Sequence, residues 1–408
     1  METVYLDKLN DIGLEKGAYM YKTIDLFAGA GGITEGFRKA GYKCICANDV
    51  DEEAKHTFTF NHPDIPYLLK DIRELTAKEI LDMGKCYASD IDVITGGPPC
   101  QGFSLAGQRI SDDPRNILFR EYIRITKDIQ PKVIFFENVH GIMNMQAGKV
   151  LQAIVTEFGE IGYQCKYALV NAADYGVPQA RPRFVLIGVR GEDKKITFPK
   201  PTHGKKMENN GQMNLFETTL LPYVTVEEAL SNLPDIEQGE GLEEIKVKPY
   251  WNNEFQHDRI GVRRPGVLYN HRATKHSKKV QERYAMIPQG CNNSVLPIEI
   301  RTKKQNAYKL DMSQPARTVT CNFRTDLIHP IMNRGLTVRE AARLQSFDDD
   351  YCFFGNLTRK AKWLTQDDQV GNAVPPLLAY AFAEHIKKNI LTQFEKECSK
   401  WQHHHLIK

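Results

Sequence analysis

Runs of strand length alternate with helical patterns through the first half of the chain. Apolar and β-branched residues are concentrated in residues 22–27, 42–48, 91–95, 131–136, 164–170 and 184–189. Between these runs, apolar residues recur at helical spacing in residues 32–40, 117–129 and 148–161. Strands that alternate with helices are typical of α/β domains built on a largely parallel sheet. We therefore predict an open α/β domain for this part of the chain.

The pattern changes after residue 190. Residues 192–222 are polar and contain prolines, and turn residues are frequent beyond them. Helical spacing returns in residues 336–347, and a final helix is predicted from Pro376 to about Thr392. These changes predict a first domain over residues 1–190, a smaller mixed second domain over 191–330 and a third stretch over 331–408.

Composition narrows the class of protein. The 408 residues are 41% hydrophobic and 26% charged, and no apolar run is long enough to cross a bilayer. Residues 1–21 carry charges of both signs and no apolar signal core, so we expect a cytoplasmic protein without membrane contact. The nine cysteines include no Cys-x-x-Cys pair, which predicts reduced thiols and no metal site. The net charge of +3 is too small to indicate nucleic acid, so any such contact must come from local charge.

A glycine-rich turn, Ala28-Gly29-Ala30-Gly31-Gly32, follows the run 22–27 and precedes a helix. Such turns bring backbone N–H groups and a helix N-terminus up to a ligand, although tight packing of a strand on a helix also selects glycine. Asp49 ends the next strand about twenty residues later, where nucleotide-binding folds place a carboxylate for ribose hydroxyls. Thr34 stands in place of the third glycine of the dinucleotide fingerprint, which argues against NAD and a dehydrogenase.

A stiff turn follows the run 91–95. Its sequence is Gly96-Gly97-Pro98-Pro99-Cys100-Gln101-Gly102-Phe103-Ser104. The prolines fix their own φ angles and restrict the residues before them, and the glycines let the backbone approach a ligand closely. Cys100 is therefore held in place, either as a nucleophile or as a buried structural cysteine.

Glu137 ends the apolar run 131–136 and is followed by Asn138 and Val139. A carboxylate at the carboxyl end of a buried parallel strand faces the crevice in which open α/β sheets bind ligands. Burial there would raise its pKa and let the group carry a proton. A helix-capping or ion-paired glutamate would look the same in sequence, so the functional interpretation of Glu137 depends on its pairing with Cys100.

Taken in order, these segments resemble the C5-cytosine-specific DNA methyltransferases of the bacterial or archaeal restriction-modification type. The resemblance extends over residues 25–385, apart from much of 192–300. The segments that match family motifs are Asp25 to Gly32, Gly96 to Ser104, Glu137 to Val139, Gln179 to Arg183, Pro315 to Thr320 and Gln369 to Pro376. The resemblance implies a Rossmann-like, S-adenosylmethionine-dependent methyltransferase domain and a smaller, mixed target-recognition domain. It also implies that residues 331–408 complete the first domain, with the C-terminal helix beside the first motif.

The resemblance assigns roles to individual residues of this chain. Cys100 would add to the target ring, Glu137 would contact ring nitrogen 3, and Arg183 would reach the carbonyl oxygen, with Arg181 in the same motif. The residues implied to bind S-adenosylmethionine are Phe27, Gly29, Gly31, Asp49, Val50, Asp71, Ile72, Pro99, Leu118, Asn372 and Ala373. Asp49 and Val50 depart from the family pattern, which often has glutamate followed by tryptophan.

Basic residues are frequent in the second domain, interleaved with aromatic and amide side chains. Such a run is typical of a solvated face, and equally of a surface that contacts phosphates and base edges. The run includes Arg259, Arg263, Arg264, Arg283 and Lys309. The candidates for DNA contact are Ser104, Arg272, Lys275, Lys278, Lys279, Asn292 and Arg317.

The resemblance implies transfer of a methyl group to carbon 5 of a cytosine flipped out of double-stranded DNA, through a covalent adduct on Cys100. Two alternatives stay open: an RNA cytosine methyltransferase of the same fold, and a non-catalytic DNA-binding relative. RNA-directed relatives carry a Cys-Phe-Thr segment that this sequence lacks, and the set of Cys100, Glu137 and Arg183 argues for an active enzyme. We expect a monomer, with a restriction endonuclease for the same site as a candidate partner.

Overall fold

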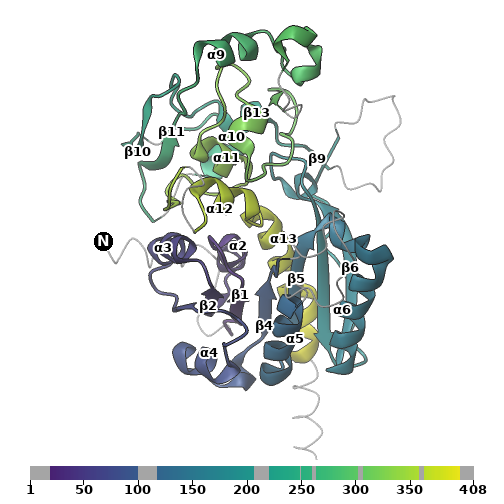
Figure 1. Cartoon of the computed structure of the whole chain (residues 1–408). Coiled ribbons are helices and arrows are strands. Elements are labelled where there is room, and N and C mark those ends of the chain that lie inside the picture. The colour runs from purple at the N-terminus through teal and green to yellow at the C-terminus, as the bar shows by residue number, and fades with distance from the viewer. Residues whose placement is uncertain are drawn as a thin grey trace, which may run out of the picture.

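The computed structural model describes residues 19–99, 117–205, 220–248, 250–259, 263–301, 307–357 and 363–395. Within these residues, seven strands form one sheet with the order β3-β2-β1-β4-β5-β7-β6. The strands are β1 (Lys22–Leu26), β2 (Lys43–Asp49), β3 (Tyr67–Leu69), β4 (Val93–Gly96), β5 (Val133–Val139), β6 (Tyr163–Asn171) and β7 (Pro182–Arg190). Figure 1 shows this sheet in the lower half of the molecule with helices packed beside it. The predicted Rossmann-like α/β architecture is confirmed.

Strands β3, β2, β1, β4 and β5 run parallel, so their carboxyl ends lie along one edge of the sheet. Strand β7 runs antiparallel to both of its neighbours, β5 and β6. In this register Glu137 lies opposite Val185, and Val139 lies opposite Arg183. The end of β5 and the start of β7 therefore meet at the edge where the parallel strands end.

Helices cover both faces of the sheet, which explains the nearly continuous apolar runs of its central strands. On one face, Ile94 and Ile134 share a core with side chains of α4 (Ala77–Gly84), α5 (Ile117–Ile129) and α6 (Lys149–Glu160). On the other face, Val93 and Val133 share a core with α2 (Gly32–Lys39) and α13 (Pro376–Ile386). Helix α3 (Glu52–Asn61) covers the end of the sheet near β3. Adjacent residues of each central strand thus point into opposite cores.

Helix α13 returns the chain to the sheet and packs against α2 (Figure 1). It continues into a π-helical turn, Lys387–Leu391. A Cβ on Gly32 would lie 2.2 Å from the carbonyl oxygen of Val374, and a Cβ on Gly36 would lie 2.5 Å from that of Pro376. Glycine is needed at both positions because α2 packs so closely against Val374 and Pro376 that no room is left for a methyl group.

A second lobe lies above the sheet in Figure 1 and consists of short elements. They are α7 (Val226–Leu230), β10 (Gly241–Lys246), α8 (Glu254–Asp258), β11 (Val267–Arg272), α9 (Lys278–Ala285), β12 (Tyr308–Lys309), α10 (Phe323–Asp326), β13 (Leu327–Ile328), α11 (Val338–Leu344) and α12 (Gln366–Asn372). A short pair, β8 (His203–Gly204) and β9 (Leu221–Pro222), precedes them. We call residues 223–373 the second lobe.

The core of the second lobe continues past residue 330, where the sequence suggested that the first domain resumes. Val226 of α7, Leu344 of α11 and Val370 of α12 belong to one buried cluster. Every residue of α11 is buried, including its two arginines, so this helix is enclosed by the second lobe. The packing therefore assigns the chain to the second lobe until just before α13. No helix in the described part of the chain is long and apolar enough to cross a membrane.

Candidate active site

The turn between β1 and α2 has an unusual backbone. Phe27 has a φ of 57°, a left-handed conformation that a bulky side chain rarely adopts. Gly29 and Gly31 follow with φ values of 52° and 88°. A Cβ on Gly29 would meet no described atom within 4 Å, whereas a Cβ on Gly31 would lie 2.8 Å from the hydroxyl of Tyr351. Among the described residues, the turn is therefore open beside Gly29 and tightly packed beside Gly31.

Asp49 joins the end of β2 to this turn. Its carboxylate accepts hydrogen bonds from the N–H groups of Gly29 at 2.9 Å, Val50 at 2.7 Å and Asp51 at 3.2 Å. Burial raises the pKa of Asp49, and the three N–H donors oppose that rise. An ionised carboxylate has about four lone-pair sites, so Asp49 can accept further hydrogen bonds from a ligand. Asp49 and Gly29 together line the ends of β1 and β2.

Two further expected cofactor residues follow β3, the neighbour of β2. Asp71 accepts hydrogen bonds from the guanidinium of Arg73 at 3.0 Å, and these bonds lower its pKa. Ile72 is buried in the core beneath the sheet. Val50, which follows Asp49, is exposed. The ends of three adjacent parallel strands thus present the turn, Asp49 and Asp71 along one edge.

The remaining expected cofactor residues come from other parts of the chain. Leu118 of α5 is partly buried and packs against the core of its face of the sheet. Pro99 is exposed at the last described position before the Cys100 turn. Asn372, at the end of α12, accepts a hydrogen bond from the thiol of Cys321 at 3.0 Å. Cys100 and Ser104 lie outside the described residues.

Glu137 and Arg183 form a buried ion pair at the same edge of the sheet. Arg183 Nε lies 3.0 Å from Glu137 Oε1, and both side chains are about nine-tenths buried. Burial raises the pKa of Glu137, and the positive charges of Arg183 and Arg181 only partly offset the rise. A Cβ on Gly97 would lie 3.2 Å from Glu137 Oε2, so this carboxyl group lies against the start of the Cys100 turn. The next side chain, Asn138, donates to the carbonyl oxygen of Pro98 at 2.8 Å.

Arg181 occupies a different environment from Arg183. Its side chain is fully buried, and its guanidinium donates to the carbonyl oxygens of Val319 at 2.6 Å, Gly371 at 2.7 Å and Ala373 at 3.0 Å. These oxygens belong to two segments far apart in the sequence. The resemblance grouped Arg181 with the catalytic residues, but its donors are directed at backbone rather than at the open edge. Its geometry suits a clamp between segments.

The basic residues of the second lobe divide into two groups. Arg272, Lys275, Lys278 and Lys279 are exposed on β11, the following loop and α9. Arg259 and Lys309 are instead buried, and Arg263 and Arg264 are half-buried, and all four form ion pairs or hydrogen bonds to backbone. For this inner group, the expectation of a solvated or DNA-facing run is wrong. These side chains bind buried acidic residues and carbonyl groups, which a charge count along the sequence cannot distinguish from phosphates.

Two other candidates for DNA contact have partners within the protein. The carboxamide oxygen of Asn292 caps a short helical turn by accepting from the N–H and hydroxyl of Ser294 at 2.9 and 2.5 Å. That oxygen is therefore not free to form the bidentate pair by which asparagine reads adenine. Arg317 is exposed, and its guanidinium lies over the Tyr308 ring at 3.6 Å from the centroid.

Two residues that shape the site, Asp25 and Tyr351, were not predicted as site residues from the sequence. Asp25 in β1 is fully buried and accepts from the hydroxyls of Thr34 and Thr95, which joins three elements behind the turn. The position of Asp25 in the family motif Asp25 to Gly32 is the sequence signal that could have identified it as a site residue. Tyr351 contacts the turn from the second lobe, and no feature of the sequence near it indicated this contact.

Comparison with known proteins agrees with this arrangement. The family model described as C-5 cytosine-specific DNA methylase matches residues 21–388. The chain is 38% identical over 387 residues to the Type II methyltransferase M.DdeI of Desulfomicrobium norvegicum, covering 89% of this chain and 88% of that protein. It is 36% identical over 373 residues to the Type II methyltransferase M1.HphI of Haemophilus parahaemolyticus, covering 90% and 86%.

A solved structure is also similar over most of its length. It is described as a DNA modification methyltransferase encoded within a prophage of E. coli. The two chains are 29% identical with a TM-score of 0.72, and the match covers 90% of this chain and 99% of the other. The similarity therefore includes the sheet and the second lobe together.

Proposed function

The chain belongs to the C-5 cytosine-specific DNA methylase family, and on that premise we propose how this DNA cytosine-5 methyltransferase works. In the proposal, S-adenosylmethionine is the methyl donor, Cys100 is the nucleophile, and the target cytosine is flipped out of duplex DNA. The observation that supports it best is the buried pair of Glu137 and Arg183, held against the start of the Cys100 turn.

The turn and the ends of β2 and β3 fit a methyl donor that contains adenosine. No described residue fills the space beside Gly29, which would let a ligand lie against the backbone, and Asp49 beside it could accept from ribose hydroxyls. Asp71, Asn372 and Leu118 would complete the site from the neighbouring elements. S-adenosylmethionine, when bound there, supplies an electrophilic methyl group on a sulfonium. The sequence of the turn suits this donor better than a dinucleotide, because Thr34 stands in place of the third glycine of the dinucleotide fingerprint.

Cys100 would make the cytosine reactive. Carbon 5 of cytosine is a weak nucleophile, and addition of a thiolate to carbon 6 turns it into a stronger one, much as in an enamine. An ordinary cysteine has a pKa of about 8.5, so only a small fraction is ionised near neutrality unless its surroundings help. After transfer, a base removes the proton from carbon 5 and the thiolate leaves.

Glu137 would hold a proton at ring nitrogen 3 while the thiolate adds. Its raised pKa lets the carboxyl group stay protonated at a pH where an ordinary glutamate is ionised, which suits a proton donor to the ring. Arg183 holds Oε1 of the Glu137 carboxyl group and would also donate a hydrogen bond to the carbonyl oxygen of the ring. Arg181 would act indirectly, by holding the segments that carry Val319 and Ala373 against β7.

The exposed basic residues of the second lobe would hold the DNA. Arg272, Lys275, Lys278 and Lys279 lie close together in the sequence and their side chains are exposed, so all four could contact phosphates. Flipping the base costs roughly a few kcal/mol, which such contacts and the pocket would offset. By analogy with the relatives named as Type II methyltransferases, we also propose that a restriction endonuclease acts on the same site. The protein would work as a monomer in the cytoplasm.

The proposal is tested by methyl transfer and by binding. Purified protein with S-adenosylmethionine and duplex DNA should give methylated cytosines in one sequence context by bisulfite sequencing, and an RNA of the same sequence should stay unmodified.

Calorimetric titration should show binding of S-adenosylmethionine and not of NAD. Asp49→Ala should weaken that binding by roughly 1.5 to 3 kcal/mol, the value of a charged hydrogen bond. Unchanged affinity in the variant would remove Asp49 from the site.

A covalent trap tests the role of Cys100. A duplex with 5-fluorocytosine at its target should form a denaturant-stable adduct with the wild type, because fluorine cannot leave as a proton does. Cys100→Ala should form no adduct and should still bind DNA. Measurable methylation without any adduct would contradict the thiolate mechanism.

A further inference from the structure

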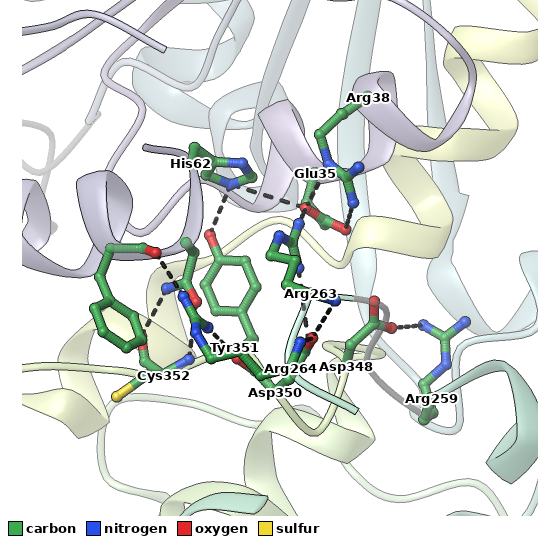
Figure 2. A network of polar contacts seen from close by, with 12 residues as sticks. Glu35, Arg38, His62, Arg259, Arg263, Arg264, Asp348, Asp350, Tyr351 and Cys352 are labelled. Carbon is green, nitrogen blue, oxygen red and sulfur yellow. Dashed lines mark hydrogen bonds and ion pairs between the residues drawn. The ribbon is translucent and has the colours of Figure 1, made fainter. Parts of the chain in front are cut away.

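Tyr351 packs against the glycine turn from the second lobe. Its side chain is fully buried, and its hydroxyl donates a hydrogen bond to the carbonyl oxygen of Ala30, 321 positions earlier in the sequence. The same hydroxyl lies 3.1 Å from Nε2 of His62. Figure 2 shows the Tyr351 ring extending toward His62 and Glu35. One phenol therefore connects the second lobe, the turn and the residue that follows α3.

The number of available protons determines the direction of these hydrogen bonds. A phenol has one proton and the carbonyl oxygen of Ala30 can only accept, so Tyr351 donates to Ala30. His62 must then donate from Nε2 to the phenol oxygen. Burial lowers the pKa of His62 to about 3, so the ring is neutral near pH 7 and carries its single proton on Nε2. In keeping with this tautomer, Nδ1 of His62 has no hydrogen-bond partner within the described part of the chain.

The second lobe fixes Tyr351 through its backbone. The N–H groups of Arg263 and Arg264 donate to the carboxylate of Asp350 at 2.8 and 2.9 Å. The Arg264 guanidinium donates to the carbonyl oxygen of Asp350 at 3.0 Å, and the Arg339 guanidinium donates to that of Tyr351. Tyr351 thus sits in a segment whose backbone is held from several sides.

Ion pairs join α2, the helix that follows the turn, to the second lobe. Glu35 of α2 is fully buried and forms an ion pair with Arg263 of the second lobe (Figure 2). Lys39, one helical turn further along α2, lies 2.8 Å from Asp348. The turn is therefore held at its own carbonyl by Tyr351 and at its following helix by these ion pairs.

The turn needs such support because its conformation is strained. Phe27 has a left-handed φ angle, which is unfavourable for a bulky residue, and Gly29 and Gly31 continue the left-handed path. Conformations of this kind persist only where neighbouring contacts determine them. Tyr351 is in contact with the turn at Ala30 and beside Gly31, on its packed side.

We propose that Tyr351 is a positioning residue for methyl transfer: acting through Ala30, it holds the glycine turn in the conformation that receives the methyl donor. This inference rests on the proposed function, in which the turn binds S-adenosylmethionine. A hydroxyl with a purely structural role would stabilise the fold without affecting cofactor affinity. A positioning hydroxyl affects that affinity specifically, and the two roles can be separated by experiment.

Tyr351→Phe removes only the hydroxyl, and Tyr163→Phe is its matched control. Tyr163 is also buried and donates to a backbone carbonyl, that of Pro131 at 2.6 Å, away from the turn. Tyr351→Phe should raise the KM for S-adenosylmethionine about tenfold, the effect of leaving a buried acceptor without its donor. Its kcat at saturating donor should stay close to that of the wild type. Tyr163→Phe should lower the melting temperature and leave that KM unchanged.

His62 provides a second test that does not alter the tyrosine. His62→Leu removes the donor to the Tyr351 hydroxyl, and His62→Gln retains an N–H donor at a similar position. The KM for S-adenosylmethionine should rise in His62→Leu and recover in His62→Gln. Equal KM values in the two variants would overturn the inference, whether or not Tyr351→Phe folds.

The outcomes separate this inference from the proposed function. If the wild type binds S-adenosylmethionine and both Phe variants bind it equally well, Tyr351 does not position the turn and the proposed function stands. If the wild type itself fails to bind S-adenosylmethionine, the proposed function is wrong and the inference falls with it. A selective rise of KM in Tyr351→Phe supports both.

Discussion

Two buried glutamates, each paired with an arginine, have opposite electrostatic surroundings. Glu137 ends β5 beside Arg183, and burial raises its pKa in spite of that pair. Glu35 lies in α2, where burial alone would raise its pKa, but Arg263, Arg38 and other cations outweigh burial and hold the pKa well below its usual range. Both carboxyl groups are shielded from water, so the cations around each decide its protonation.

This difference separates a group that can exchange a proton from a group that stays charged. A carboxyl group with a raised pKa can hold a proton and share it with a substrate ring. A carboxylate surrounded by cations is a fixed charge whose effect is to bind segments together. Glu137 lies at the open edge of the sheet and Glu35 lies between the sheet and the second lobe, so position and protonation agree.

The largest expected effect is that of Glu137→Gln on catalysis. Glutamine keeps the shape of the side chain but cannot deliver a proton, so kcat should fall by about 10² to 10⁴, the usual contribution of a general acid. Affinity for DNA should change little. Single-turnover methyl transfer at saturating DNA and donor measures this, and a variant with the kcat of the wild type would show that Glu137 is only structural.

Glu35→Gln should affect stability instead. The substitution breaks the ion pair with Arg263 and leaves that guanidinium with Asp350, at 3.7 Å, as its nearest remaining carboxylate. Breaking a buried ion pair typically costs about 3 to 5 kcal/mol. Urea unfolding should show this destabilisation. Glu137→Gln should cost less stability, because burial already disfavours the charged form of that carboxyl group, whereas the cations around Glu35 favour it. Two variants with equal decreases in stability and equal decreases in kcat would remove the distinction between the two glutamates.

Asp25 extends the comparison to a buried carboxyl group whose hydrogen-bond donors are hydroxyls. Burial raises its pKa to about 6, and hydrogen bonds from Thr34 and Thr95 oppose the rise. The folded state therefore binds the proton more tightly than the unfolded state. The proton on Asp25 therefore stabilises the folded state. This stabilisation is fully present below about pH 4, is lost as pH rises through about 6, and amounts to about 3 kcal/mol.

The test of this pH dependence is Asp25→Asn, which keeps the size of the side chain and cannot ionise. The difference in unfolding free energy between wild type and variant should change across the window from about pH 4 to pH 6 and become constant above it. Urea unfolding at several pH values measures that difference. A difference that is the same at every pH would mean that Asp25 titrates normally.

The smallest effect on stability is expected for the exposed lysines. Changing Lys275, Lys278 and Lys279 together to glutamine should leave the free energy of unfolding within about 0.5 kcal/mol per site. The plot of log affinity for DNA against log salt should become shallower by about 0.9 for each phosphate that is no longer neutralised. The matched control changes the exposed Lys43, Lys85 and Lys127 of the sheet domain. An equal change of slope in both triple variants would contradict a DNA face on the second lobe.

The sequence predicted the sheet and the strand ends well because their geometry follows from local rules. Alternating apolar runs determine the strands, and a carboxylate after a buried parallel strand must lie at the ligand-binding edge, as Glu137 does. The reversed direction of β7 could not be predicted, because the apolar pattern of a strand buried on both faces is the same in either direction.

The second lobe was less predictable because its contacts depend on tertiary packing. Arg264 and Arg272 belong to one basic run, yet Arg264 lies over Phe60 at 3.9 Å and Arg272 is exposed. Charge and spacing alone cannot tell which side of an irregular segment faces a buried acid. The contact of Tyr351 with Ala30 joins positions 321 residues apart, so no window of the sequence contains both partners.

The central claim is that Glu137 delivers a proton during methyl transfer, and the pH dependence of the reaction tests it most directly. Single-turnover rates of the wild type and Glu137→Gln should be measured from acid to alkaline pH at saturating DNA and S-adenosylmethionine. Because both proteins contain the same Cys100, the ratio of their rates cancels ionisation of the thiol. We predict that the ratio is large at low pH and falls as pH rises through the raised pKa of Glu137. A ratio that stays constant over the whole range would contradict proton transfer by Glu137.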